Sequence, residues 1–292
     1  MSIVAIVVAA TLVIVFGRGY SAYPARTVAG PSAPAASPGT TPPMSSQQPS
    51  SAPIPPSTLE PEFKELQGKL RADIGLVISA VGTGKDPVVL GNPAPGPAWS
   101  TIKVPLALAV LRAQGSADVT DTMRAAIVDS DNGAAESLWE SLGDPDAAAR
   151  KVEAVLKEYG DLTVVESRRL RPEFSAFGQT EWSLVNQTAF VARSFCEDTN
   201  SPIFDLMGQV SPGQQWGIFQ LPDSKFKGGW GPSTSGSYLV RQIGVFSTGT
   251  GMVAVAMAAQ PASGSFEEGT QDLDEIARWL GEHMAMLPSS RC

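Results

Sequence analysis

The sequence predicts an α+β domain in which an antiparallel five-stranded sheet is flanked by the N- and C-terminal helices and carries an inserted all-helical lobe. Three observations lead to this prediction. An amphipathic helical segment precedes two short strand-like runs, the middle of the chain is mostly helical, and three more strand-like runs precede a final helix. This order closes most simply as one sheet, and a cleft between sheet and lobe would be a natural functional site.

The amino-terminal part of this domain is expected to form a helix and a β-hairpin. Residues 57–73 begin with a capping box of Ser57 and Glu60 and continue with apolar residues at helical spacing. The runs IGLVISAV and PVVLG follow, separated by the turn-forming stretch GTGKD. This arrangement predicts two paired antiparallel strands.

The remaining elements are expected from similar local signals. The runs QWGIFQL, SYLVRQIGVFS and MVAVAMAAQ predict the three later strands, and a helix is expected from about residue 266 to 286. In the helical region, Gly115 is expected to end a helix that starts near Ser100. Asp144 and Pro145 are expected to begin the next long helix as its N-cap and first residue.

The first 56 residues differ in composition from the rest. Within residues 1–19, positions 2–16 carry no charge, which predicts a signal or membrane-anchor segment. Residues 20–56 are rich in proline, serine and alanine, and this composition predicts a disordered linker. We therefore expect an exported protein, either secreted or membrane-anchored on the extracytoplasmic face, with its globular domain at 57–292. Cleavage of the first segment stays open.

Charge and cysteine content exclude some classes of function. The net charge of −8 and the absence of a lysine or arginine stripe argue against nucleic acid as a partner. The two cysteines, Cys196 and Cys292, form no CxxC or Cys/His cluster, so we expect no metal and no cofactor. They are either paired in a disulfide or are one buried and one terminal thiol.

The histidine content limits the possible catalytic chemistry. The single histidine, His283, falls in the predicted last helix, and the chain has no GxSxG motif. A serine–histidine–aspartate triad is therefore not expected, and His283 is interpreted as a surface residue near a helix end. A serine nucleophile would need another base, and a desolvated lysine can serve because burial lowers its pKa towards neutrality.

Three short motifs contain the residues for such chemistry. STIK begins at Ser100 and ends in Lys103, so both side chains leave the same face of a helix. SDN begins at Ser130, in a turn between two predicted helices, and KGG begins at Lys227, beside a predicted edge strand. Each motif alone is explained equally well by a helix cap, a turn or a strand. Together they stand where a shared cleft would require them.

The order Ser-x-x-Lys, Ser-Asp-Asn, Lys-Gly-Gly resembles the motif set of class A β-lactamases and penicillin-binding proteins, whose third motif is Lys-Thr-Gly. The resemblance covers about residues 57–287 and implies a β-lactamase/transpeptidase-like fold. It implies that Ser100 is the nucleophile and Lys103 its base or proton relay. Ser130 would pass a proton to the leaving nitrogen, and Asn132 would bind the amide of the substrate's side chain.

The resemblance also assigns the third motif to substrate binding. Lys227 would hold the substrate carboxylate and tune the proton affinity of Ser130. The backbone amides of Ser100 and Trp230 would form an oxyanion hole, and Gly229 would let the backbone approach the ligand closely.

The sequence departs from this family at three places. Gly228 replaces the usual threonine or serine of the third motif, and Arg241 is either a compensating charge or an exposed strand residue. In the stretch VVESRRLRPEFSAFGQT, neither Glu166 nor Glu173 precedes Leu-Asn as the deacylating glutamate of class A enzymes does. Either glutamate, Gln179 or none of them would then position the water. The short spacing from Ser100 to the second motif predicts a more open cleft.

Two functions remain open from the sequence. The first is an exported serine hydrolase or acyltransferase that forms a Ser100 acyl-enzyme on a small-molecule β-lactam or a peptidoglycan peptide. The second is a catalytically weak or inactive tethered module that binds the cell wall or a protein partner. In either case we expect a monomer that contacts the membrane only through an uncleaved N-terminal segment.

Overall fold

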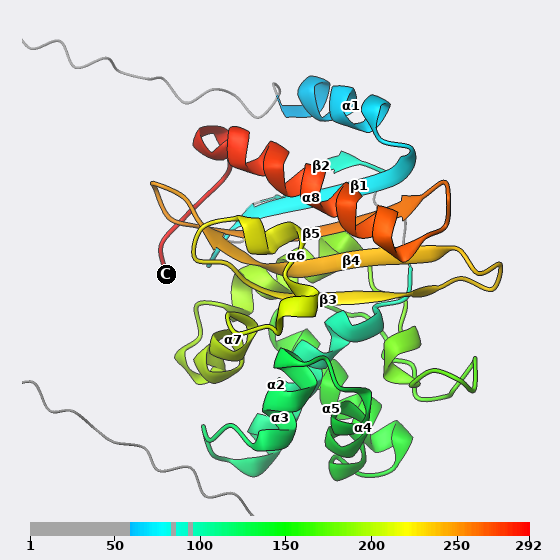
Figure 1. Cartoon of the computed structure of the whole chain (residues 1–292). Helices are drawn as coiled ribbons and strands as arrows, with labels where there is room; N and C mark the ends of the chain where they lie inside the picture. The colour runs from blue at the N-terminus through cyan, green and yellow to red at the C-terminus, as the bar shows by residue number, and fades with distance from the viewer. Residues whose placement is uncertain (1–58, 83–85, 93–95) are drawn as a thin grey trace, which may run out of the picture. The chain divides into compact units, whose positions relative to one another are not determined.

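The computed structural model describes residues 59–82, 86–92 and 96–292 (Figure 1). The predicted signal or anchor segment, 1–19, and the predicted linker, 20–56, lie outside these residues. No helix in the described ranges is long and apolar enough to cross a membrane.

The architecture is the predicted α+β arrangement, a five-stranded antiparallel sheet with strand order β2-β1-β5-β4-β3. The predicted order of helix, two strands, helical lobe, three strands and helix is confirmed, with these bounds: α1 (Leu59–Lys69), β1 (Ala72–Ala80), β2 (Val88–Gly91), α2 (Lys103–Gln114), α3 (Asp121–Val128), α4 (Asn132–Ser141), α5 (Pro145–Glu158), α6 (Leu184–Ser194), α7 (Ser201–Met207), β3 (Lys225–Pro232), β4 (Tyr238–Ser247), β5 (Met252–Pro261) and α8 (Phe266–Glu282).

The sheet is covered on both faces, because alternate side chains of its strands enter two separate cores. On β1, Leu76 and Ile78 pack with α1 and α8, whereas Val77 packs with the helices of the lobe and α6. Figure 1 shows α1 and α8 together on one side of the sheet, with α2 to α5 forming the lobe below its β3 edge. The lobe and that edge strand enclose the cleft described below.

The expected helix boundaries in the lobe are confirmed by their caps. Gly115 ends α2 with a φ of 63° and donates its N–H to Arg112 O at 3.3 Å. Asp144 caps α5 by accepting from the N–H of Ala147 at 2.8 Å, and Pro145 is the first helical residue.

One predicted strand is wrong. In QWGIFQL, residues Gly217–Gln220 form a 3₁₀ helix, and the third-last strand of the sheet lies instead at Lys225–Pro232. The N–H of Gly217 donates to Asp274 Oδ1 at 2.6 Å, and the N–H of Ile218 to Gln242 Oε1 at 2.8 Å. Side chains therefore take the bonds that a neighbouring strand would otherwise make. The apolar alternation reflects burial against α8, not pairing in the sheet.

The end of the chain is tied back to the domain. Cys196 and Cys292 form a disulfide bond, which decides between the two alternatives left open by the sequence. Ser290 and Met252 exchange two backbone hydrogen bonds at 2.7 and 3.2 Å, so the chain end pairs in antiparallel fashion with the first residue of β5. The closed loop spans 96 residues.

Candidate active site

A cavity of about 400 Å³ lies where the start of α2 and the start of α4 face the carboxyl-terminal half of β3. Ser100 and Lys103 line it from the α2 side, Asn132 and Glu136 from α4, and residues 230–232 from β3. The loop 169–178 forms the remaining wall. Its size is within the range of small-molecule sites.

Ser100 sits in a 3₁₀ helix, Trp99–Ile102, that runs directly into α2. Trp99, just before it, has a φ of 49°, a left-handed conformation that costs about 1–2 kcal/mol for a residue with a Cβ. Such a cost is tolerated when the surroundings hold the backbone in place. Here the Ala98 N–H donates to Thr180 O at 2.7 Å, and Thr101 Oγ1 donates back to Ala98 O at 2.6 Å.

Lys103 is almost fully buried and points at the second motif. Its Nζ donates to Ser130 O at 2.6 Å, Asn132 Oδ1 at 2.8 Å, Asp131 O at 3.2 Å and Ser130 Oγ at 3.4 Å. Burial lowers its pKa from 10.5 to about 8, although the negative charges of Asp131 and Glu136 oppose this effect. A fraction of this amine is therefore neutral near pH 7.

Ser130 owes its position to its backbone. With a φ of 57° it turns the chain between α3 and α4, so that its carbonyl oxygen faces Lys103. Asp131 then caps α4 by accepting from the N–H of Ala134 at 2.6 Å, and this cap places Asn132 in the first turn. The motif is thus a turn with an N-cap and also part of the cleft.

Lys227 approaches Ser130 from the opposite side. Its Nζ donates to Ser130 Oγ at 2.8 Å, Gly228 O at 2.9 Å and Gln214 Oε1 at 3.4 Å. Burial lowers the pKa of Lys227 well below its usual value, and repulsion from Lys103 adds to this effect. Two buried amines therefore meet at one hydroxyl, and each disfavours the other's charge.

The glycine of the third motif that contacts the nucleophile is Gly229. A Cβ on Gly229 would lie 2.8 Å from Ala98 O and 3.0 Å from the Ser100 backbone nitrogen. Only glycine therefore lets β3 approach the Ser100 backbone this closely. The next residue, Trp230, lines the cavity.

The space for the missing hydroxyl of the third motif is filled. A Cβ on Gly228 would lie 3.1 Å from the ring of Trp216, and Trp216 contacts Trp230 edge-on with ring centroids 6.1 Å apart. The cavity walls include neither Gly228 nor Trp216. A larger residue at 228 would displace Trp216 before it reached the cleft.

The loop that would activate water keeps its polar groups occupied. Glu166 does not line the cavity, and its Oε1 accepts from the backbone and side chain of Arg168. Glu173 does line it but pairs with Arg171 at 3.2 Å. Gln179 is buried. Its amide oxygen accepts from Arg171 N, and its amide nitrogen donates to the loop carbonyls of residues 171, 174 and 175.

Gln179 therefore holds the loop together, and its proposed water-orienting role is not supported by this geometry.

Both sequence interpretations of Arg241 are also wrong. Arg241 is fully buried, and its Nη1 donates to Gly96 O at 2.8 Å and Pro97 O at 2.7 Å. Burial lowers the pKa of this guanidinium to about 10. Arg241 thus fastens the segment that precedes Ser100 and offers no charge to the cleft.

The structure brings together the residues predicted for the site. Four of them line the cavity, namely Ser100, Lys103, Asn132 and Trp230. Lys227 bonds to Ser130, and Ser130 bonds to the cavity-lining Lys103. Gly229 packs against the Ser100 backbone. In the described part of the chain, no hydrogen bond links Ser100 Oγ to Lys103 Nζ. His283 lies elsewhere, stacked on Trp279 with ring centroids 4.2 Å apart and paired with Glu62 of α1.

Sequence reasoning missed an ion pair in the cleft. Glu136 lines the cavity one helical turn after Asn132, and its Oε1 lies 3.1 Å from Nη2 of Arg169 on the loop. The i, i+4 spacing of Asn132 and Glu136 was a usable signal, because such residues share one helix face. No local signal indicates that Arg169 folds back onto α4.

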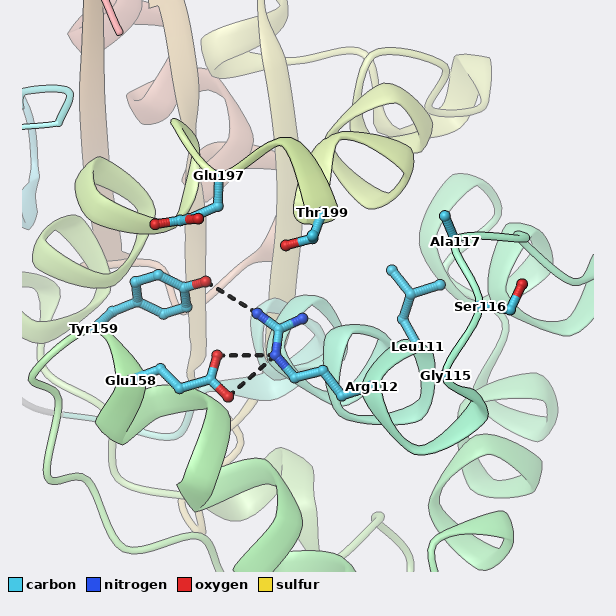
Figure 2. Close-up of a pocket in the computed structure, with 9 residues that line it drawn as sticks. All are labelled: Leu111, Arg112, Gly115, Ser116, Ala117, Glu158, Tyr159, Glu197 and Thr199. Atoms are coloured by element: carbon cyan, nitrogen blue, oxygen red, sulfur yellow. Dashed lines mark hydrogen bonds and ion pairs between the residues drawn. The ribbon is translucent and has the colours of Figure 1, made fainter.

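A second cavity, of about 560 Å³, lies at the other end of α2 (Figure 2). Figure 2 shows Arg112 pointing between Glu158 and Tyr159. Its Nε contacts Glu158 Oε2 at 2.8 Å, and its Nη2 donates to the hydroxyl of Tyr159 and to Asn200 Oδ1, both at 3.0 Å. These groups satisfy one another, and no lysine lies among its lining residues, so the cleft at Ser100 is the better candidate for acyl chemistry.

No cluster of three or more His, Cys, Asp or Glu side chains suited to a metal ion occurs in residues 59–82, 86–92 and 96–292. By sequence, no protein family model and no curated protein matches this chain. By structure, the chain is similar to many solved proteins.

Three examples, all β-lactamases, illustrate this similarity. One is from Xanthomonas campestris (18% identity, TM-score 0.60, covering 78% of this chain and 97% of that one). The second is from Streptosporangium roseum (17% identity, TM-score 0.58, covering 77% of this chain and 99% of that one). The third is a class A enzyme from Mycobacterium abscessus (16% identity, TM-score 0.57, covering 76% of this chain and 98% of that one). The chain therefore has the serine β-lactamase-like fold.

Proposed function

We propose that this protein is an exported serine hydrolase or acyltransferase that forms a Ser100 acyl-enzyme on a β-lactam or a cell-wall peptide. One observation carries the proposal. Lys103 and Lys227, both buried, donate to the same hydroxyl, Ser130 Oγ, beside a cavity lined by Ser100. Burying two amines is costly, and a purely structural role does not require them at one serine.

In the proposed reaction, neutral Lys103 accepts the hydroxyl proton of Ser100 as Ser100 Oγ attacks the substrate carbonyl. The carbonyl carbon gains the bond to oxygen and then loses its bond to nitrogen. Ser130 donates its proton to that nitrogen, and the Lys103 ammonium, whose Nζ lies 3.4 Å from Ser130 Oγ, returns one to Ser130 and becomes neutral again. Because Lys103 contacts Ser130 and Asn132, its lone pair must turn towards Ser100 before the attack. Proton transfer of this kind contributes about 10²–10⁴ in rate.

Release of the acyl group is expected to be slow. The cavity-lining carboxylates of Glu136 and Glu173 are each paired with an arginine, and Glu166 is bound to Arg168 outside the cavity. In each pair an arginine nitrogen contacts a carboxylate oxygen that would otherwise accept a proton from water. None of the three is therefore poised to activate a water molecule.

The test is intact-protein mass spectrometry of the full-length chain incubated with benzylpenicillin. The variants Ser100→Ala and Ser116→Ala are the matched pair, because Ser116 lies at the far end of α2 and bonds only to Asp118. A long-lived adduct on the wild type and on Ser116→Ala, absent from Ser100→Ala, is expected. Rapid consumption of the drug without an adduct, dependent on Ser100, would keep the serine hydrolase but reject slow release.

A second candidate is a tethered binding module that retains the cleft without turnover. The absence of a hydrogen bond between Ser100 and Lys103 in the described residues favours it, as does the space of the missing hydroxyl at Gly228 being filled by Trp216. This candidate is selected if the protein forms no adduct with benzylpenicillin or with an acylating peptide thioester and consumes neither compound.

Export is part of the proposal and rests on the uncharged run at 2–16 and the linker-like composition of 20–56. Fractionation of cells that make the full-length chain tests it. Recovery of the protein only in the cytoplasm would reject export, and recovery in the membrane or the medium would distinguish an anchor from a cleaved signal.

A further inference from the structure

The ion pair between Glu136 and Arg169 lies inside the cleft and is incomplete. The ion pair joins Oε1 of Glu136 and Nη2 of Arg169, which lie 3.1 Å apart. Within the described residues, neither the Glu136 carboxylate nor the Arg169 guanidinium makes a hydrogen bond. The Arg169 side chain is 53% exposed and that of Glu136 25%. Both groups therefore keep bonding capacity that a ligand in the cavity can reach.

The pair also has a defined place relative to the reacting serine. Glu136 follows Asn132 by one turn on the same face of α4, so their Cβ atoms are about 5–6 Å apart. If Asn132 binds the amide of the substrate's acyl side chain, the side chain continues from there towards Glu136 and Arg169. An end group four or five bonds beyond the amide would meet them.

The rest of the cleft limits which end groups fit. Across the cavity, Arg171 donates to Pro232 O and lies over the Phe174 ring at 4.4 Å, so the loop is joined to β3 at that side. Trp99 meets Phe174 edge-on, with centroids 5.0 Å apart. This side carries aromatic rings beside the Arg171–Glu173 pair, whereas the Glu136–Arg169 pair lies one helical turn from Asn132.

We propose that this pair recognises a zwitterionic end group on the substrate's acyl side chain, an ammonium and a carboxylate on one carbon, as in an amino acid. The ammonium binds the free oxygen of Glu136, and the carboxylate binds the free nitrogens of Arg169. A group with only one charge would leave one partner of the pair unmatched. The inference rests on the proposed function in taking the acyl side chain to pass Asn132, and it names the substrate class of that cleft.

Equilibrium binding in the full-length Ser100→Ala background tests the inference without requiring acylation. The probes are cephalosporin C, whose aminoadipyl side chain ends in an ammonium and a carboxylate, and the adipyl cephalosporin, in which a hydrogen atom replaces the ammonium. Calorimetry is expected to show about tenfold tighter binding of the zwitterionic probe, as one charged hydrogen bond provides. Adding Glu136→Gln should bring the ratio of the two dissociation constants close to one, because it removes the partner of the ammonium. Adding Arg169→Gln removes the partner of the carboxylate, which both probes carry, and should weaken the binding of both probes about tenfold.

Arg168→Gln is the matched control, because Arg168 belongs to the same basic run, is 78% exposed and does not line the cavity. It should keep the tenfold ratio. Equal binding of the two probes, no binding of either, a ratio that survives Glu136→Gln, or binding of both probes that Arg169→Gln leaves unchanged would overturn the inference. The proposed function fails separately, if the wild type forms no Ser100 adduct with either probe and consumes neither. A tenfold ratio without acylation would mean that the cleft recognises zwitterions without turning them over.

Discussion

The pH dependence of acylation should report the titration of Lys103. Its pKa, lowered by burial from 10.5 to about 8, leaves about a tenth of the amine neutral at pH 7 and about nine tenths at pH 9. If neutral Lys103 is the base, the second-order acylation rate rises about tenfold between these values. An amine with the usual pKa would be neutral about 300-fold less often at pH 7. Burial is therefore what makes the reaction possible at neutral pH.

The charge of Asp131 provides the sharpest variant. It raises the pKa of Lys103, so Asp131→Asn should lower that pKa and move the rising limb of the pH profile to lower pH. Asparagine is as good an N-cap as aspartate, so α4 should keep its first turn. Asp144→Asn makes the same chemical change at the cap of α5 and should leave the profile in place.

Stopped-flow acylation with a chromogenic cephalosporin, at pH 6 to 10 and under single-turnover conditions, measures the profile. Unfolding at the pH extremes is monitored in parallel by circular dichroism. A rate that does not change across this range, or a limb that Asp131→Asn moves to higher pH, would refute Lys103 as the base. A limb near pH 10.5 would mean that burial does not perturb this amine.

Three further substitutions test the scaffold of the site. Gly229→Ala should lower the free energy of unfolding by about 1–3 kcal/mol in urea titrations and reduce acylation, because its Cβ has no room, whereas Gly213→Ala has open space and should do neither. Arg241→Met leaves the carbonyls of Gly96, Pro97 and Trp182 without their buried donor. It should lower the free energy of unfolding by about 3 kcal/mol or more and also reduce the acylation rate. Cys292→Ser removes a 96-residue closure, should cost up to about 4 kcal/mol in stability and should leave acylation at 25 °C unchanged; an equal loss of rate would link the tail to the site.

The fold and most of the site could be predicted because their signals are local. Gly115 at a left-handed C-cap and Asp144 with Pro145 at an N-cap determine helix ends whatever surrounds them. The spacing of Ser100 and Lys103 places both at the start of one helix. What the sequence could not predict is that Lys103 reaches four acceptors of the second motif, since this depends on the left-handed turn at Ser130.

The errors came from residues whose local preference yields to long-range contacts. KFKGGWG is poor in strand-forming residues, yet it forms β3 because its backbone pairs with β4 along Lys225–Pro232. Gly229 in turn gives the Ser100 backbone room to approach. QWGIFQL alternates like a strand, yet Asp274 and Gln242 bind its backbone as a 3₁₀ helix. Arg241 was interpreted either as a compensating charge for the cleft or as an exposed strand residue, since charged residues seldom lie in a core. It is buried instead, because the carbonyls of Gly96, Pro97 and Trp182 accept its hydrogen bonds.

The groups proposed for acylation and those available for hydrolysis lie on different parts of the chain. The acylation groups belong to the lobe and the sheet, and both lysines, Lys103 and Lys227, donate to the hydroxyl of Ser130. The side chains that could activate water are those of the loop 166–179 and Glu136 of α4. Glu166, Glu173 and Gln179 bind within the loop, and Glu136 pairs with Arg169 of the loop. A single substitution that released one of these carboxylates as a base would therefore also remove a bond that holds the loop. We therefore expect an ester at Ser100 to persist until an amine, a stronger nucleophile than water, enters the cleft, which favours acyl transfer over hydrolysis.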